Sequence, residues 1–142
     1  MKHIDLYTGN YEITLLTVDE YKQYEPQIPT INDRWWLRSP GSGKLYAAYV
    51  SDAGGVPNYG DSVNTDDDAV RPALKSEIID LPIGKQIIAL GNRWTVIDTG
   101  LAISNEPVAH RRFDCESNDW GTSELKVWLE KWAKDGERRE KE

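Results

Sequence analysis

The sequence predicts one α+β domain, in which small, twisted, mainly antiparallel sheets carry two helices. Short apolar blocks rich in β-branched and aromatic residues recur along the chain, separated by turns that contain Gly or Pro. Two segments have a helical pattern instead. A chain of 142 residues can bury a core without disulfide or metal support. We assign residues 1–136 to this domain and the charged residues 137–142, which lack an apolar anchor, to a disordered tail.

The N-terminal part of the chain predicts a strand followed by a short helix. Residues 11–16 are β-branched and partly alternating, as in a strand. Thr17 and Glu20 have the spacing of a capping box, in which each side chain bonds the backbone N–H of the other. A helix is therefore expected from Val18 to Tyr24. Pro26 and Pro29 prevent it from continuing.

Further strands are expected in the middle of the chain, near Trp36, at 46–51 and at 70–74, with long polar loops between them. Residues 86–90 and 93–98 are two apolar runs that flank Gly91-Asn92. This pattern predicts a β-hairpin with a two-residue turn.

A second helix is predicted near the C-terminus. Thr122 or Ser123 can cap its start, and Asp135-Gly136 can end it. Its large apolar residues form one stripe with helical spacing, which we expect to pack against a sheet. The stripe consists of Leu125, Trp128, Leu129 and Trp132.

Three blocks in the middle of the chain resemble a known family. Residues 35–40 read Trp-Trp-Leu-Arg-Ser-Pro, residues 47–50 read Ala-Ala-Tyr-Val, and residues 70–74 read Val-Arg-Pro-Ala-Leu. These blocks resemble an uncharacterised C-type-lectin-like domain of Gram-positive gut bacteria and their phages. That domain is related to formylglycine-generating enzymes and to the variable proteins of diversity-generating retroelements. The resemblance spans roughly residues 11–134 and implies a C-type-lectin-like fold.

The block order differs from the common form of that family. There, the hairpin and the helix that resemble residues 91–97 and 123–132 precede the Trp-Trp-Leu-Arg-Ser-Pro block, whereas here they follow it. The order therefore looks circularly permuted, which a fold with neighbouring termini tolerates.

The segment from Gly41 to Asp68 is the predicted binding surface. It is rich in Asn, Asp, Ser, Gly and Tyr, which supply rigid rings and adaptable polar groups. The alternative is an ordinary irregular loop. The candidate ligand-binding residues are Trp35, Lys44, Tyr46, Tyr49, Asp52, Asn58, Tyr59, Asp61, Asn64 and Asp66.

Two arginines and several tryptophans are assigned to structure rather than to binding. We expect Arg38 and Arg71 to tie loop carbonyls together, with an anion pocket as the functional alternative. The residues predicted to be structural are Trp36, Arg38, Arg71, Trp94, Trp128 and Trp132.

Composition argues against several classes of function. The net charge of −7 disfavours direct nucleic-acid binding, and no apolar run is long enough for membrane insertion. A single cysteine, Cys115, excludes an intrachain disulfide and agrees with a cytoplasmic location. No cofactor fingerprint is present, and the Asp66-Asp67-Asp68 run has no calcium-loop spacing, so neither a cofactor nor a metal is predicted.

We therefore expect a non-enzymatic binding module for an unidentified protein or small polar molecule. Cys115 and His110 are the only catalytic candidates, and no motif supplies an orienting group or an oxyanion hole. The formylglycine-generating relatives depend on two active-site cysteines, which this chain does not have. The alternative function is an acidic, phage-encoded inhibitor of a host defence protein.

Overall fold

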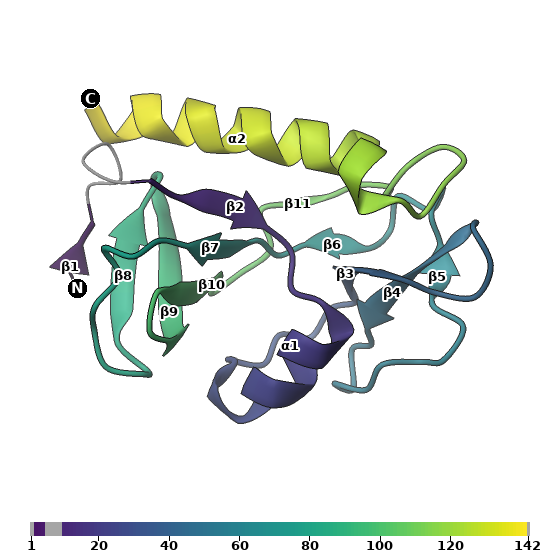
Figure 1. Cartoon of the computed structure of the whole chain (residues 1–142), viewed down its shortest axis with the longest axis horizontal. Helices are drawn as coiled ribbons and strands as arrows, with labels where there is room; N and C mark the ends of the chain where they lie inside the picture. Colours follow the sequence, from purple (N-terminus) through teal and green to yellow (C-terminus); the bar gives the residue numbers. More distant parts are fainter. Residues whose placement is uncertain (1, 5–9, 142) are drawn as a thin grey trace.

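The computed structural model describes residues 2–4 and 10–141, which form two sheets and two α-helices (Figure 1). The sheets are neighbours along the long axis of the molecule. The helix α2 (Glu124–Lys141) extends along one side of them, and α1 (Val18–Tyr24) lies on the other side. The predicted α+β class, with mainly antiparallel sheets and two helices, is confirmed for the described residues.

The first sheet has six strands in the order β1-β8-β9-β10-β7-β2. Only the β1–β8 pair is parallel. Its strands are β1 (Lys2–His3), β2 (Glu12–Thr14), β7 (Ala73–Lys75), β8 (Gln86–Ala89), β9 (Asn92–Asp98) and β10 (Leu101–Ser104).

The second sheet has five strands in the order β11-β6-β3-β4-β5, and only β3 and β6 pair in parallel. Its strands are β3 (Trp35–Pro40), β4 (Tyr46–Val50), β5 (Asp61–Ser62), β6 (Ala69–Val70) and β11 (Ala109–His110). Two 3-10 helices, η2 (Glu25–Gln27) and η3 (Trp120–Thr122), follow α1 and precede α2.

Both faces of the sheets are buried, which explains the continuous apolar blocks in the sequence. Successive strand residues point to opposite faces. Trp36 accordingly enters the core beneath α2, whereas its neighbours Trp35 and Leu37 enter the core beneath α1. Leu15 and Leu16, just after β2, divide in the same way.

The structure confirms the predicted N-terminal helix and its cap. The Thr17 side chain accepts from the Glu20 N–H, and the Glu20 carboxylate accepts from the Thr17 N–H. The other Glu20 oxygen accepts a 3.0 Å hydrogen bond from Lys75 of β7. Arg38 Nη2, on β3, lies 3.6 Å from the first Glu20 oxygen. The cap therefore also fixes α1 against both sheets.

The predicted single strand at 70–74 is wrong, because the structure has two strands there. β6 belongs to the second sheet and β7 to the first, with Arg71-Pro72 between them. Proline has no N–H for a sheet ladder, so the chain changes sheets at this point. The change of sheet places the Arg71 side chain at the junction.

The predicted hairpin is present, but its turn is displaced by one residue. Ala89 pairs with Asn92, so Leu90-Gly91 form the turn instead of Gly91-Asn92. Both turn residues have positive φ, 55° and 68°, as a type I′ turn requires. Leu90 is nevertheless fully buried, which indicates that core packing outweighs the backbone preference for Asn or Gly at this position.

The second predicted helix begins as expected but ends later. Ser123 Oγ accepts from the Lys126 N–H, as an N-cap does. The prediction that Asp135-Gly136 ends the helix is wrong, because α2 continues through a buried Gly136 to Lys141. A helical glycine costs only about 1 kcal/mol, and the Tyr11 hydroxyl stabilises the extension by donating to Glu137.

The apolar stripe of α2 packs on the sheets, but the indoles lie at its edges. Leu125, Leu129 and Ala133 are buried, whereas Trp128 and Trp132 are only partly buried against the same core. Two other predicted structural tryptophans, Trp36 and Trp94, are fully buried. Their ring nitrogens donate 2.8 Å hydrogen bonds to the carbonyls of Arg111 and Ala89, respectively.

Candidate functional site

A pocket of about 200 Å³ lies where α1 and the chain after η2 meet the loop that follows β4. Its wall on the β4 side is residues 50–54, within the predicted binding segment. The opposite wall belongs to residues 21–32, and the pocket floor contains Trp35 and Arg71. Segments distant in the sequence therefore meet at one site.

The loop wall of the pocket is a tight turn that is tied to α1. Ser51 N–H donates to the Gly55 carbonyl at 2.7 Å, and Gly54 N–H donates to the Ser51 carbonyl at 2.9 Å. The hydroxyl of Tyr21, on α1, donates to the Gly54 carbonyl at 2.7 Å. These bonds hold the two walls together without a ligand, so the pocket is preformed.

Arg71 is held on the floor by backbone carbonyls and an aromatic ring. Nε donates to the Ser104 carbonyl at 2.7 Å, and Nη2 donates to the carbonyls of Pro29 and Asn105 at 2.7 and 3.4 Å. Its guanidinium carbon lies 5.0 Å from the centre of the Trp35 ring. Trp35 in turn meets Tyr21 edge to face at 5.5 Å.

The charge of Arg71 has an unusual environment. The residue is 1% exposed, and no carboxylate of the described residues forms an ion pair with it. This burial lowers the pKa of Arg71 to about 10, so the guanidinium is still protonated at neutral pH. A buried cation balanced only by carbonyls and a ring face is costly and attracts anions.

Two of the predicted ligand-binding residues line this pocket. Trp35 is 2% exposed and forms part of the floor. Asp52 is exposed at the rim, where Glu25 contributes a second carboxylate.

Four other predicted binding residues lie around a separate tip formed by the loops after β3 and β4. Tyr46 and Tyr59 are 41% and 72% exposed, and their carbonyls accept from Gly41 and Ser42 at 2.7 and 2.9 Å. Lys44 and Asn58 are exposed on the same loops. Gly60 allows the second of these loops to pass close to the backbone of β4, because a Cβ there would lie 2.4 Å from the Ala47 carbonyl oxygen.

Asp61 and Tyr49 belong to a third group, an acidic cluster beneath the loops. Asp68, which the sequence did not single out as a binding residue, is fully buried here beside Asp61. Arg34 Nη1 lies 3.6 Å from Asp61, and Arg34 Nε lies 3.3 Å from Asp68. Burial, followed by the contact with Asp61, raises the pKa of Asp68 to about 8. The protonated carboxyl of Asp68 can then donate to Asp61.

The two remaining predicted binding residues are apart from the pocket. Asn64 accepts a 3.1 Å hydrogen bond from Arg112 Nη1, and Asp66 is exposed. The ten predicted residues therefore divide among the pocket, the tip, the acidic cluster and these outer positions.

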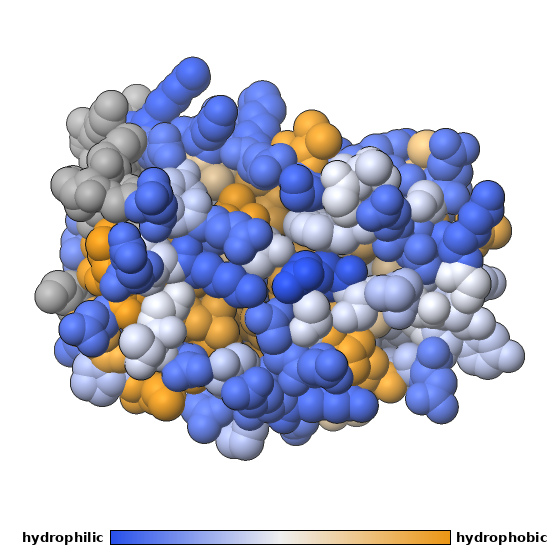
Figure 2. Space-filling model, in the orientation of Figure 1, coloured by the Kyte–Doolittle hydropathy of each residue, from blue (hydrophilic) through white to orange (hydrophobic). Residues whose placement is uncertain are grey.

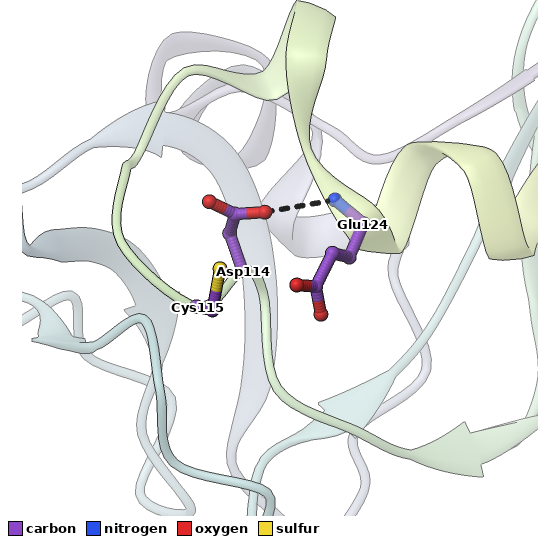
Figure 3. A group of neighbouring side chains, drawn as sticks. All are labelled: Asp114, Cys115 and Glu124. Carbon is purple, nitrogen blue, oxygen red and sulfur yellow. Dashed lines mark hydrogen bonds between the residues drawn. The ribbon is translucent and has the colours of Figure 1, made fainter.

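A group of possible metal ligands occurs at the start of α2 (Figure 3). One ligand atom each from Asp114, Cys115 and Glu124 lies within 4.8 Å of the others. Asp114 already accepts from the backbone N–H groups of Glu116, Ser117 and Glu124, and Glu124 pairs with Arg112 at 2.8 Å. These contacts are those of a structural helix start, and a metal would have to displace them.

The two catalytic candidates from the sequence are engaged elsewhere. His110 Nε2 lies 2.6 Å from Asp33. The pKa of Cys115 is raised, first by its hydrogen bond to Glu124, so the reactive thiolate is disfavoured. No hydrogen bond joins Cys115 to His110 in the part of the chain that the structure describes.

Sequence reasoning missed the pocket wall that residues 21–32 form. Tyr21 was predicted only as part of a helix, and residues 28–32 were predicted only as a segment interrupted by proline. Arg71 was singled out, as a residue that ties loop carbonyls together or forms an anion pocket. An arginine directly before proline, between two short apolar runs, was the available signal that its charge is buried at a change of sheet.

Comparison of the chain with family models, curated proteins and solved structures finds no match. None of the described helices is long and apolar enough to span a membrane. The surface visible in Figure 2 is mainly hydrophilic, with hydrophobic residues in small, separate areas.

Proposed function

We propose that the chain is a non-enzymatic binding module of C-type-lectin-like architecture, which binds its ligand through the loops between residues 41 and 68. The observation that carries this proposal is the pocket behind residues 50–54, with Trp35 and Arg71 on its floor. A preformed hollow with aromatic walls and one placed charge is typical of ligand sites.

Rigidity beneath the loops supports a role in binding. Trp36 and Trp94 are fully buried in the framework, and the tip is fixed by Asn118, whose side chain donates to the carbonyls of Gly43 and Tyr46 at 2.6 and 2.8 Å. A loop whose backbone is already fixed avoids the cost of ordering that backbone when it binds. Catalysis has weaker support, because Cys115 and His110 have different partners.

Affinity capture from a host-cell lysate, with mass spectrometry of both proteins and small molecules, tests this proposal. The captured ligand is then titrated against variants with a bulky side chain at one site. Ala53→Trp fills the pocket at an exposed wall position, so it should abolish binding without unfolding the chain.

Asn58→Trp, on the exposed tip, introduces the same side chain outside the pocket. Loss of binding in Asn58→Trp alone would move the site to the Tyr46–Tyr59 tip. A double charge reversal, Glu77→Lys with Asp80→Lys, changes acidic positions away from both loops. If it abolished binding while both tryptophan variants bound normally, the loop proposal would be wrong and an acidic inhibitor surface would be favoured.

A further inference from the structure

The Arg71 side chain has one end that its structural contacts do not use. A guanidinium has five N–H groups in a fixed fork. Nε and Nη2 are bound to three carbonyls, whereas no described residue accepts a hydrogen bond from Nη1. Arg71 is also a lining residue of the pocket. An oxyanion that entered the pocket would complete the hydrogen bonding of the buried cation.

Charge of the opposite sign lies at the pocket rim. Glu25 and Asp52 line the opening from opposite walls, and both are exposed. The pKa of Tyr21 is raised, mainly by burial and also by the charge of Glu25, while the charge of Arg71 opposes the shift. This buried phenol therefore interacts electrostatically with both charges. The site thus has a cation at its floor and anions at its mouth.

This polarity selects against simple anions. A dianion such as phosphate would gain the contact with Arg71 but would face two carboxylates as it entered. A ligand that carries both a carboxylate and an ammonium group, with the carboxylate turned toward Arg71 and the ammonium group toward the rim, would satisfy both charges.

The size of the pocket sets the size of that ligand. A cavity of about 150 Å³ can hold benzene, so the volume here, about 200 Å³, suits one ring or branched side chain with its polar groups. The Trp35 and Tyr21 rings and the side chain of Ile28 supply apolar contact.

We infer that the pocket binds a zwitterion of amino-acid size, with its carboxylate on Arg71 and its ammonium group near Asp52 and Glu25. This inference rests on the proposed binding function and names the chemical class of its ligand.

Three probes of one shape test the inference by calorimetric titration. L-phenylalanine has both charges, 3-phenylpropionate has only the carboxylate, and phenethylamine has only the ammonium group. We expect L-phenylalanine to bind most tightly, 3-phenylpropionate more weakly, and phenethylamine not measurably, because the amine alone leaves Arg71 unpaired.

The Asp52→Asn variant gives the sharpest result, because its effects on the two carboxylate probes have opposite signs. Loss of the rim charge should weaken the binding of L-phenylalanine and strengthen the binding of 3-phenylpropionate. Each affinity should change by about two- to fivefold, as expected for exposed charges. Glu25→Gln should act in the same direction. Asp80→Asn, an exposed carboxylate outside both the pocket and the segment 41–68, is the matched control and should change neither affinity.

Arg71→Lys retains the positive charge but not the forked N–H groups of the guanidinium. It should weaken the binding of L-phenylalanine by more than about tenfold. Should this variant fail to fold, the rim variants still decide the matter. If Asp52→Asn changed the binding of both carboxylate probes in the same direction, or if Asp80→Asn had the same effects as Asp52→Asn, the inference would be overturned. Absence of binding by all three probes at about 10 mM, far above the Kd of even a weak specific ligand, would also overturn it. In that case, loss of the captured ligand in Ala53→Trp would show that the binding function stands without this ligand class.

Discussion

At the scale of single residues, Asp68 makes a pH-dependent contribution to stability. Its carboxyl is fully buried beside Asp61, with Arg34, Asp67 and Tyr49 nearby, and its pKa is raised from 3.8 to about 8. The folded state therefore holds a proton that the unfolded state releases above about pH 4. The stabilising contribution is complete below that pH and is lost as the pH rises through about 8.

The Asp68→Asn variant tests this dependence. Its free energy of unfolding relative to the wild type should increase from pH 5 to pH 9, because the amide cannot ionise. Denaturant melts at several pH values measure the difference. A difference that stays constant across this range would mean that Asp68 titrates normally in the folded protein.

Leu90 provides a second test at the residue scale, because its backbone and its side chain have opposite preferences. Its φ of 55° costs about 1–2 kcal/mol for an L-residue other than glycine, while its side chain is fully buried. Leu90→Ala should lower the free energy of unfolding by about 2–5 kcal/mol. Leu90→Gly removes the same side chain but relieves the backbone, so it should be at least as stable as Leu90→Ala in denaturant melts. A clearly less stable glycine variant would show that the turn is not strained.

At the scale of elements, the fully enclosed residues of α2 are aliphatic, and its tryptophans lie at the edge of the contact. Leu129 is fully buried, whereas Trp128 is half-buried and its ring lies 5.0 Å from the guanidinium carbon of Arg111. Leu129→Ala should cost about 2–5 kcal/mol. Trp128→Ala should cost less, about 1–2 kcal/mol, because solvent can fill the space that a ring at the edge of the contact leaves, whereas truncation of Leu129 leaves an enclosed cavity. Thermal melts of the two variants measure this difference. If the indoles were the main contact of the helix, Trp128→Ala would be the less stable variant.

Elements with local signals could be predicted from the sequence, and elements defined by long-range contacts could not. The bounds of α1 follow from a capping box and a proline within nine residues. The two strands at 69–70 and 73–75 share one apolar block, and only their partners in different sheets distinguish them. The sequence-based prediction put the hairpin turn one residue too late, because burial of Leu90 overrides the local preference for Gly or Asn in the turn.

The candidate site was only partly predictable for the same reason. Composition marked residues 41–68 as a polar binding segment, and Asp52 and Trp35 do line the pocket. The Tyr21 wall and the unused end of Arg71 depend on contacts across 33 and 42 residues of sequence, which periodicity and motifs do not encode.

At the scale of the whole molecule, two helices and two sheets bury both sheet faces, and the proposed binding occurs at the pocket between α1 and the loop that follows β4. An amide NMR titration with the ligand recovered from lysate tests most directly whether that binding occurs in the pocket. We expect the largest shift changes at residues 21–35, at 50–54 and at Arg71, with little change at Tyr46, Tyr59 or Cys115. Shift changes centred on the Tyr46–Tyr59 tip or on the start of α2, with the pocket residues unchanged, would contradict this assignment of the binding site.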